Sequence, residues 1–211
     1  MLIANAVYFQ GAWTTEFDPS ATHPAAFNLS DGSQVTVQMM DRSAGEYGQY
    51  GTPDFEVIRL PYGAGHLSML IVMPNAGTDF NQFVSSISPA SIDSWRGSLI
   101  KQSGRLDLPR FKTAYKSSLD GTLQALGMRS AYGTRGCLPQ LSDGCISNVS
   151  HGTAVEVNEN GTVAAAATTI TITTSVASSY PIIDRPFFYA ILDDDSGLLL
   201  FIGVMRDPTL G

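Results

Sequence analysis

The side chains that could act as acids, bases or nucleophiles are few in this 211-residue chain, and they are poorly arranged for catalysis. Its three histidines are His23, His66 and His151, and none of them lies beside an obvious Ser or Cys nucleophile in a loop. The Gly-x-Ser-x-Gly nucleophile elbow and the glycine patterns of nucleotide-binding loops are also missing. We expect His23 in a surface loop, His66 at a strand edge or interface, and His151 in a structural hydrogen bond. The chain is therefore not expected to be an enzyme.

Two further groups could bind a metal or form a covalent link. Asp193–Asp195 are adjacent carboxylates between two apolar segments, and they lack the alternating oxygen ligands of a calcium loop, so we expect a solvated hairpin turn. Cys137 and Cys145 flank a short loop rich in turn formers, with no His at a zinc-ligand spacing. This pattern favours a disulfide, with two free thiols as the alternative. We expect no metal and no cofactor.

The segment Glu156–Pro186 is unusual because it contains almost nothing but small or β-branched residues after an Asn-Gly pair. Four consecutive alanines, Ala164–Ala167, would tolerate a helix, whereas the alternation Thr169–Thr173 favours a strand. An uncharged, β-prone segment is normally protected by charge or proline. Leaving it unprotected indicates that strand formation is its use.

Periodicity predicts a strand-rich chain with a few short helices around this segment. Residues 2–9 form a nearly continuous apolar run, which is typical of a strand buried on both faces. Apolar spacing predicts two short helices within 79–99, broken near Pro89, and a third over 118–128. The remaining predicted strands are two segments of 27–40 around the hairpin signal Asp31-Gly32, then 55–61, 66–74, 105–111, 153–158, 187–192 and 198–205.

Composition limits the kinds of partner. The chain is 44% hydrophobic and 15% charged, which is enough for a sizeable core. Its net charge is −7 and its basic residues are scattered, which argues against nucleic acid or an anionic membrane as a partner. No run approaches the roughly 20 apolar residues that span a bilayer. Met1–Ala4 has no basic start and no cleavage site, so we expect the start of a strand there and no signal peptide.

Several motifs, taken together, resemble the C-terminal half of a serpin, a serine protease inhibitor that works by loop insertion. The matching segments occur in the family's order and cover essentially the whole chain. They are NAVYFQGAW (5–13), LPYGAGHLSMLIVMP (60–74), LPRFK (108–112), LQALGM (123–128), HGTAVEVNENGTVAAAATT (151–169) and DRPFFYAILDDDSGLLLFIGVMRDP (184–208).

This resemblance implies an α+β fold with mixed β-sheets, a few short helices and an exposed reactive loop. Residues 1–211 would be one serpin domain, with the hinge and reactive loop at 159–186. The family's N-terminal half, which holds most helices and two strands of the central sheet, is absent from this sequence. A serpin acts as a suicide substrate, because its loop is cleaved and then inserts into the central sheet.

The resemblance also assigns roles to particular residues. The hinge would be Glu159, Gly161, Thr162, Ala164, Ala165, Ala166, Ala167 and Thr168. In an inserted strand, Ala164, Ala166 and Thr168 would face the core, followed by Ile170 and Ile172. Because small residues lead, the strand can begin to enter before the sheet has opened far.

The cleaved bond is located by the family's spacing from the hinge glycine and from the Arg-Pro-Phe motif. Both counts place it after Ser175, so Ser175–Val176 is the expected bond, with shifts of one residue, to Thr174 or Val176, as alternatives. A small uncharged residue there suits a shallow specificity pocket. The expected partner is an elastase-like or subtilisin-like serine protease.

The family pairs a strand Asn with a His eight residues before the hinge Glu, at the point where the sheet opens. Here these are Asn5 and His151, with Trp13 near the top of the opening. Val163 stands where the family often has Glu. We expect an extracellular or secreted inhibitor. The competing hypothesis is a truncated serpin-like fragment that inhibits nothing and serves as a β-rich interaction module.

Overall fold

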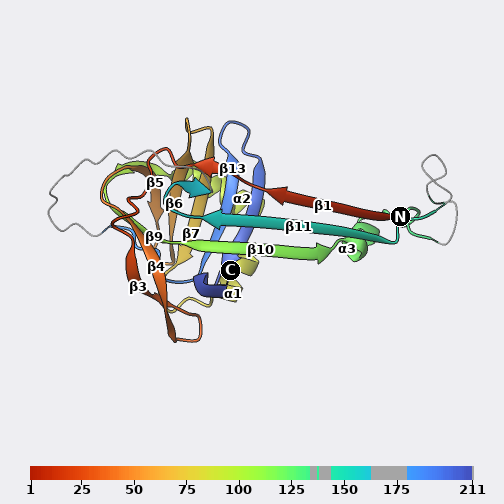
Figure 1. The fold of residues 1–211 in the computed structure, drawn as a ribbon, viewed down its shortest axis with the longest axis horizontal. Coiled ribbons are helices and arrows are strands. Elements are labelled where there is room, and N and C mark those ends of the chain that lie inside the picture. The colour runs from red at the N-terminus through yellow and green to blue at the C-terminus, as the bar shows by residue number, and fades with distance from the viewer. Residues whose placement is uncertain (134–136, 138–143, 163–179, 211) are drawn as a thin grey trace. The chain divides into compact units, whose positions relative to one another are not determined.

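The computed structural model describes residues 1–133, 137, 144–162 and 180–210 (Figure 1). Its contacts divide the chain into two compact units, which are described separately here. The first comprises Met1–Phe9 and Thr113–Val155, and the second comprises Gln10–Lys112 and Glu156–Gly211. Within the described ranges, no helix has the length and apolar character needed to span a membrane.

The first unit is built on a three-stranded sheet in the order β1-β11-β10. Its elements are β1 (Leu2–Tyr8), most of β10 (Phe111–Ser118), the short helix α3 (Asp120–Ala125) and most of β11 (Asn148–Val157). Strand β1 pairs with β11 in parallel, in a register that runs from Leu2 opposite Asn148 to Tyr8 opposite Ala154. The segment that precedes the expected hinge is thus a sheet strand.

The prediction that residues 2–9 are buried on both faces is wrong. Strand β1 forms as expected, but Leu2 is 67% exposed and Tyr8 is 53% exposed. The apolar run indicated a strand covered on both faces, yet six of the seven residues of β1 are exposed, and among the described residues the strand pairs only with β11. The apolar side chains of β1 are therefore suited to burial, but they are mostly exposed in this unit.

The predicted helix over 118–128 is shorter than its apolar spacing indicated. Helix α3 ends at Ala125 and buries none of its residues, and Leu126 beyond it is 80% exposed. The turn at Gly127, with φ +105°, ends the helical geometry. Asp120 anchors the helix, because its carboxylate accepts hydrogen bonds from the amide of Val149 at 2.7 Å and the side chain of Asn148 at 2.9 Å.

The second unit contains a six-stranded antiparallel sheet in the order β14-β13-β7-β6-β5-β8. The strands are β5 (Glu46–Gly51), β6 (Phe55–Tyr62), β7 (Leu67–Pro74), β8 (Ile100–Ser103), β13 (Phe187–Asp193) and β14 (Leu199–Met205). Strands β6, β7, β13 and β14 confirm the predictions from apolar runs. Strands β5 and β8 were not predicted, because EYGQYG and IKQS are too polar to give an alternation signal.

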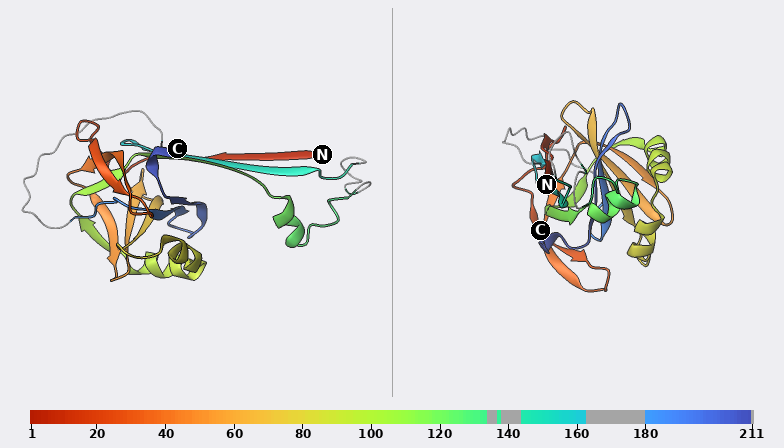
Figure 2. Two further views of the ribbon diagram at one scale, coloured as in Figure 1. Left: turned by 90° about the horizontal axis from the view of Figure 1, so that it is seen from below. Right: turned by 90° about the vertical axis from the view of Figure 1, so that its right-hand side faces the viewer.

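Two helices pack on this sheet, and Figure 2 shows them, in yellow-green, beside one face of it. They are α1 (Phe80–Ser86) and α2 (Pro89–Ser98). Ile92 and Trp95 of α2 join the sheet residues Val57, Leu70 and Phe188 in one core cluster. The predicted break near Pro89 is confirmed, since Pro89 begins α2 behind a capping box formed by Ser88 and Ser91.

A smaller sheet and a short strand pair complete the second unit. The sheet order is β3-β4-β9, with β3 (His23–Asn28), β4 (Gln34–Arg42) and β9 (Leu106–Pro109). The hairpin predicted at Asp31-Gly32 is confirmed, and Gly32 has the positive φ of +85° that such turns need. The strand predicted over 105–111 is divided between β9 and β10 at Arg110. The short strand pair consists of β2 (Gly11–Ala12) and β12 (Gly161–Thr162). The last element described is the 3-10 helix η1 (Pro208–Leu210).

Candidate functional site

The chain leaves β11 through a tight turn at Asn158–Gly161. The amide of Asn158 donates to the carbonyl of Gly161 at 2.9 Å, and the amide of Gly161 donates back to the carbonyl of Asn158 at 3.1 Å. The side chain of Asn158 accepts from the amide of Asn160 at 3.1 Å, which closes the turn locally. The chain then pairs as β12 with β2, so it reverses direction at this point.

Gly161 is the residue that this turn most strictly requires. Its φ is +134°, outside the range that L side chains readily adopt. A Cβ at this position would lie 2.2 Å from the carbonyl oxygen of Gly11 and 2.7 Å from the Cα of Ala12. The close approach of β12 to β2 therefore depends on the missing side chain.

Glu159 fixes the turn to the rest of the second unit. It is 5% exposed, and its Oε1 accepts from the Arg110 guanidinium at 2.6 Å from Nε and 2.5 Å from Nη2. The hydroxyl of Thr22 donates to the same oxygen, and the backbone carbonyl of Glu159 accepts from the amide of Phe17 at 2.9 Å. A buried carboxylate requires such partners, so these contacts hold the turn in one place.

Trp13 and Tyr62 hold the two sides of the hinge together. The indole Nε1 of Trp13 donates to the carbonyl of Asn158 at 3.0 Å, and its ring stacks on Tyr62 with centroids 4.4 Å apart. The Tyr62 hydroxyl lies 3.0 Å from Oγ1 of Thr162, which is fully buried. Burial raises the pKa of Tyr62, so the phenol keeps its proton at ordinary pH.

A pocket of about 630 Å³ lies beside the hinge in the second unit. Its lining includes two cation–carboxylate pairs, Arg110 with Glu159 and Lys112 with Glu156 at 3.1 Å. Both cations are thus balanced by carboxylates on the same wall. The carboxylates of Glu156 and Glu159, which flank the hinge turn, are therefore both paired with cations at this pocket.

The chain that returns from the loop is also fixed at a defined point. The amide of Asp107 in β9 donates to the carbonyl of Pro181 at 3.1 Å, and the amide of Ile183 donates to the carbonyl of Asp107 at 2.9 Å. The guanidinium of Arg105 lies over the ring of Tyr180, 4.3 Å from its centroid. Both ends of the expected reactive loop are therefore anchored in the second unit.

Asn5 and His151 lie opposite each other on β1 and β11 in the first unit. Their side-chain nitrogens Nδ2 and Nδ1 are 3.5 Å apart, at the limit of a hydrogen bond. The structure thus brings together the pair that the resemblance implied. Trp13 belongs to the second unit, where it contacts the hinge turn as described above.

The two cysteines of the first unit, Cys137 and Cys145, form a disulfide with their Cα atoms 4.9 Å apart. Several other site residues named from the sequence lie outside the described residues. These are Ala164, Ala165, Ala166, Ala167 and Thr168 of the hinge, and Thr174, Ser175 and Val176 around the expected bond.

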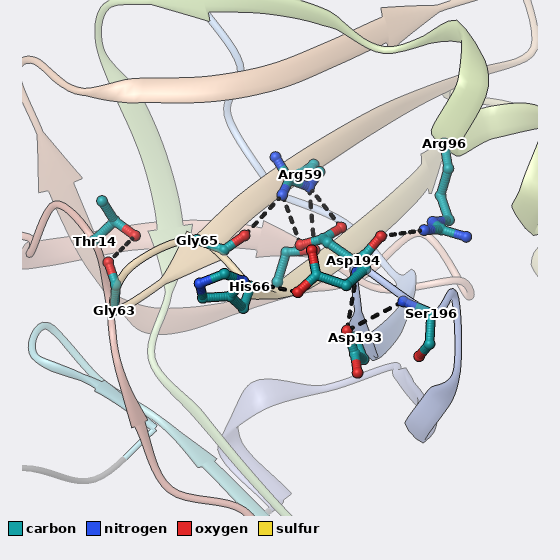
Figure 3. A network of polar contacts seen from close by, with 11 residues as sticks. Thr14, Arg59, Gly63, Gly65, His66, Arg96, Asp193, Asp194 and Ser196 are labelled. Atoms are coloured by element: carbon teal, nitrogen blue, oxygen red, sulfur yellow. Dashed lines mark hydrogen bonds and ion pairs between the residues drawn. The ribbon is translucent and has the colours of Figure 1, made fainter.

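The turn at Asp193–Asp195 belongs to a polar network, part of which Figure 3 shows. The Asp193 carboxylate accepts from the amides of Asp195 and Ser196 within the turn itself. The Asp194 carboxylate binds Arg59 through two bonds, of 2.6 and 3.0 Å, and its backbone carbonyl accepts from Arg96 at 3.1 Å. His66 lies 2.8 Å from Asp195, and both of these side chains are exposed. The expectation of a solvated turn is therefore wrong for Asp194, whose side chain is only 17% exposed. The ring of His23, at the start of β3, lies on the surface.

Sequence reasoning did not find the residues that hold the hinge and the loop exit. Arg110 and Thr22 contact Glu159 across 49 and 137 residues of chain, respectively, and no local pattern signals such pairs. Tyr62 falls within a matched motif, but its role becomes visible only from its contact with Thr162. Arg105 gave no signal beyond its place in a predicted strand.

Comparisons with known proteins agree with this arrangement. A family model described as Serpin (serine protease inhibitor) matches residues 1–208. An alpha-1-antitrypsin homolog of Cyprinus carpio is 35% identical over 214 residues, which cover 99% of this chain and 57% of that protein. Serpin-Z4 of Hordeum vulgare is 32% identical over 228 residues, which cover 100% of this chain and 56% of that protein.

Solved structures give the same result. The native state of tengpin, a thermophilic serpin, matches with a TM-score of 0.79 and 25% identity over 97% of this chain and 55% of that one. The chain thus spans a little over half the length of the relatives it matches. Because the family model covers almost every residue and the α+β fold follows the same order of elements, the chain belongs to the serpin family of serine protease inhibitors.

Proposed function

We propose that this chain inhibits a serine protease as a suicide substrate, through cleavage of its loop and insertion of the loop beside β11. The observation that supports the proposal most strongly is the parallel pairing of β1 with β11. The chain reverses direction after β11, so a strand formed by the loop would run antiparallel to β11. It would then also be antiparallel to β1, and the space between two parallel neighbours suits such a strand on both sides.

The energetics favour insertion once the loop is free at one end. Before insertion, one ladder of hydrogen bonds joins the seven residues of β1 to β11. After insertion, the loop strand would form one ladder with β1 and a second ladder with β11. At roughly 1 kcal/mol net per hydrogen bond, the additional ladder stabilises the inserted state by about 5–10 kcal/mol. Burial of Ile170 and Ile172 would add about 1.5–3 kcal/mol each. A total of this size rivals the stability of a whole domain, which is enough to carry an attached protease along.

The residues around the expected bond define the proposed target. Thr174, Ser175 and Val176 are small and uncharged, so they fit a shallow specificity pocket and offer no cation to a trypsin-like one. We infer that the partner is an elastase-like or subtilisin-like protease that cleaves after Ser175. The disulfide between Cys137 and Cys145 supports an oxidising, extracellular site of action.

The test is formation of a covalent complex that survives SDS. The chain is incubated with elastase, subtilisin and trypsin, and we expect a complex with at least one of the first two and a new N-terminus at Val176. Ala166→Arg would place a charge on the face that enters the sheet, so the variant should be cleaved without trapping the protease. Ala165→Arg is the matched control, because its side chain would stay on the opposite face.

Two outcomes would overturn parts of this proposal. Capture of trypsin with elastase and subtilisin untouched would contradict the proposed target class. Cleavage by all three proteases without any stable complex would contradict inhibition itself. That second result would favour the competing function, a β-rich interaction module.

A further inference from the structure

The place where the loop returns to the fold has an unusual concentration of charge around one aromatic ring. The guanidinium of Arg105 lies over Tyr180 at 4.3 Å and binds Asp107 through Nε at 3.1 Å and Nη2 at 3.2 Å. Its Nη2 also lies 2.9 Å from Oδ2 of Asp41. The Tyr180 hydroxyl reaches Oδ2 of Asp107 at 3.4 Å. Three side chains, those of Asp41, Asp107 and Tyr180, thus meet around the guanidinium of Arg105.

Burial makes this arrangement dependent on Arg105. The side chain of Asp107 is 5% exposed and that of Asp41 is 19% exposed, so water screens neither carboxylate fully. Among the described residues, Arg105 is the cation that the structure pairs with both. Without it, two partly buried carboxylates would face each other uncompensated, which is costly. The ring of Tyr180 covers one face of the guanidinium and gains a cation–π contact.

Residues 181–183 pair with β9 over a short length only, before the amide of Asn28 binds the carbonyl of Asp184 at 2.7 Å. The contact with β9 consists of the two hydrogen bonds to Pro181 and from Ile183, around a single bridge between Asp107 and Ile182. Isolated pairing of this length is marginal in water. Ile183 is fully buried and the Asn28 side chain donates to Asp184, and the stack of Arg105 on Tyr180 adds the side-chain contact that lies nearest the loop.

We propose that Arg105 is a positioning residue that clasps Tyr180 and thereby holds the distal end of the reactive loop for capture by the protease. This inference rests on the proposed function. A reactive loop that is fixed at both ends loses less conformational freedom when the protease binds it. The clasp therefore acts on the rate of capture. The hinge, at the other end, decides whether a captured protease is trapped or released.

Kinetics separate these two roles. We expect Arg105→Ala and Tyr180→Leu to lower the second-order rate of complex formation about tenfold, with an unchanged fraction of protease trapped per cleavage. Tyr180→Phe keeps the ring and should stay within about twofold of the wild type. Ala166→Arg should show the reverse pattern, with normal capture and a reduced trapped fraction. The matched control is Arg206→Ala. It also removes a cation from an aromatic ring, that of Phe80 at 5.0 Å, but at a site remote in sequence from the loop.

Hydrogen exchange gives a readout that does not depend on inhibition. The amides of Asp107 and Ile183 donate the two backbone bonds at the clasp. Both should exchange about tenfold faster in Tyr180→Leu and in Arg105→Ala, and at the wild-type rate in Arg206→Ala. Normal exchange and normal capture in Tyr180→Leu would overturn the clasp. If the wild type captures no protease, the proposed function fails, while the exchange rates still test whether Arg105 holds this end of the loop.

Discussion

At the residue scale, buried charges in the second unit are compensated in different ways. Glu159 meets a guanidinium, whereas the hydrogen bonds of Arg42, which is 3% exposed, go to the backbone carbonyls of Thr15 and Glu46 in the described part of the chain. Its guanidinium lies near the rings of Phe17 and Tyr47, at 5.4 and 5.9 Å, and its Nε has no hydrogen-bond partner among the described residues. Burial lowers the pKa of Arg42 to about 10. The charge therefore costs stability where it lies.

Replacement of this charge should stabilise the protein. Because the folded-state pKa of Arg42 lies below its ordinary value of 12.5, its penalty is complete below pH 10 and is relieved as the pH rises through that value. We expect Arg42→Met to raise the free energy of unfolding by about 1 kcal/mol at pH 7, as replacement of other buried charges does. Urea unfolding at pH 7 and pH 10.5 measures the effect, and the gain should shrink at the higher pH. A loss of more than 1 kcal/mol in Arg42→Met would contradict this account.

At the element scale, the hinge turn between β11 and β12 depends on the backbone conformation of Gly161. Gly161→Ala would combine a strained φ with a contact of 2.2 Å to backbone, so we expect a loss of about 3 kcal/mol in unfolding free energy. Gly32→Ala is the matched control, because its φ is also positive but no atom lies within 4 Å of the added carbon. It should cost about 1 kcal/mol. Equal losses in the two variants would show that the packing of β12 on β2 does not constrain Gly161.

The elements that the sequence predicted are those with a strong local signal. Apolar spacing and Pro89 located α1 and α2, and Asp31-Gly32 located the hairpin between β3 and β4. The alternation signal failed for β5, which lies inside the sheet, and for β8 at its edge, because their sequences EYGQYG and IKQS carry Gly, Gln and Lys in place of alternating apolar residues. The burial of β1 was mispredicted for a different reason, since composition cannot reveal whether other elements cover the two faces of a strand.

The site was predictable where a motif marks it and unpredictable where long-range contacts build it. The resemblance pointed to Glu159, Gly161 and Trp13, and all three lie together at the turn. It assigned no role to Arg110, which lies in the matched motif LPRFK and neutralises Glu159, or to Arg105 at the other end of the loop. Such partners are set by the packing of segments that are distant in sequence, and this appears only in the folded chain.

At the scale of the whole molecule, the proposed mechanism divides its tasks between the two units. The first unit contains the parallel pair β1 and β11 that must separate, and the second fixes both ends of the loop. The chain spans a little over half the length of its serpin relatives, and the exposed edge of β1 has no second neighbour among the described residues. The central claim is that the intact loop is held out of a sheet that it would stabilise.

The most direct test of that claim is the melting temperature of the chain before and after one cleavage within residues 163–179. If the cleaved loop inserts, a gain of about 5–10 kcal/mol should raise the melting temperature by about 10–40 °C for a chain of this size. Ala166→Arg, cleaved in the same way, should show little or no rise. An unchanged or lower melting temperature in the cleaved wild type would contradict loop insertion.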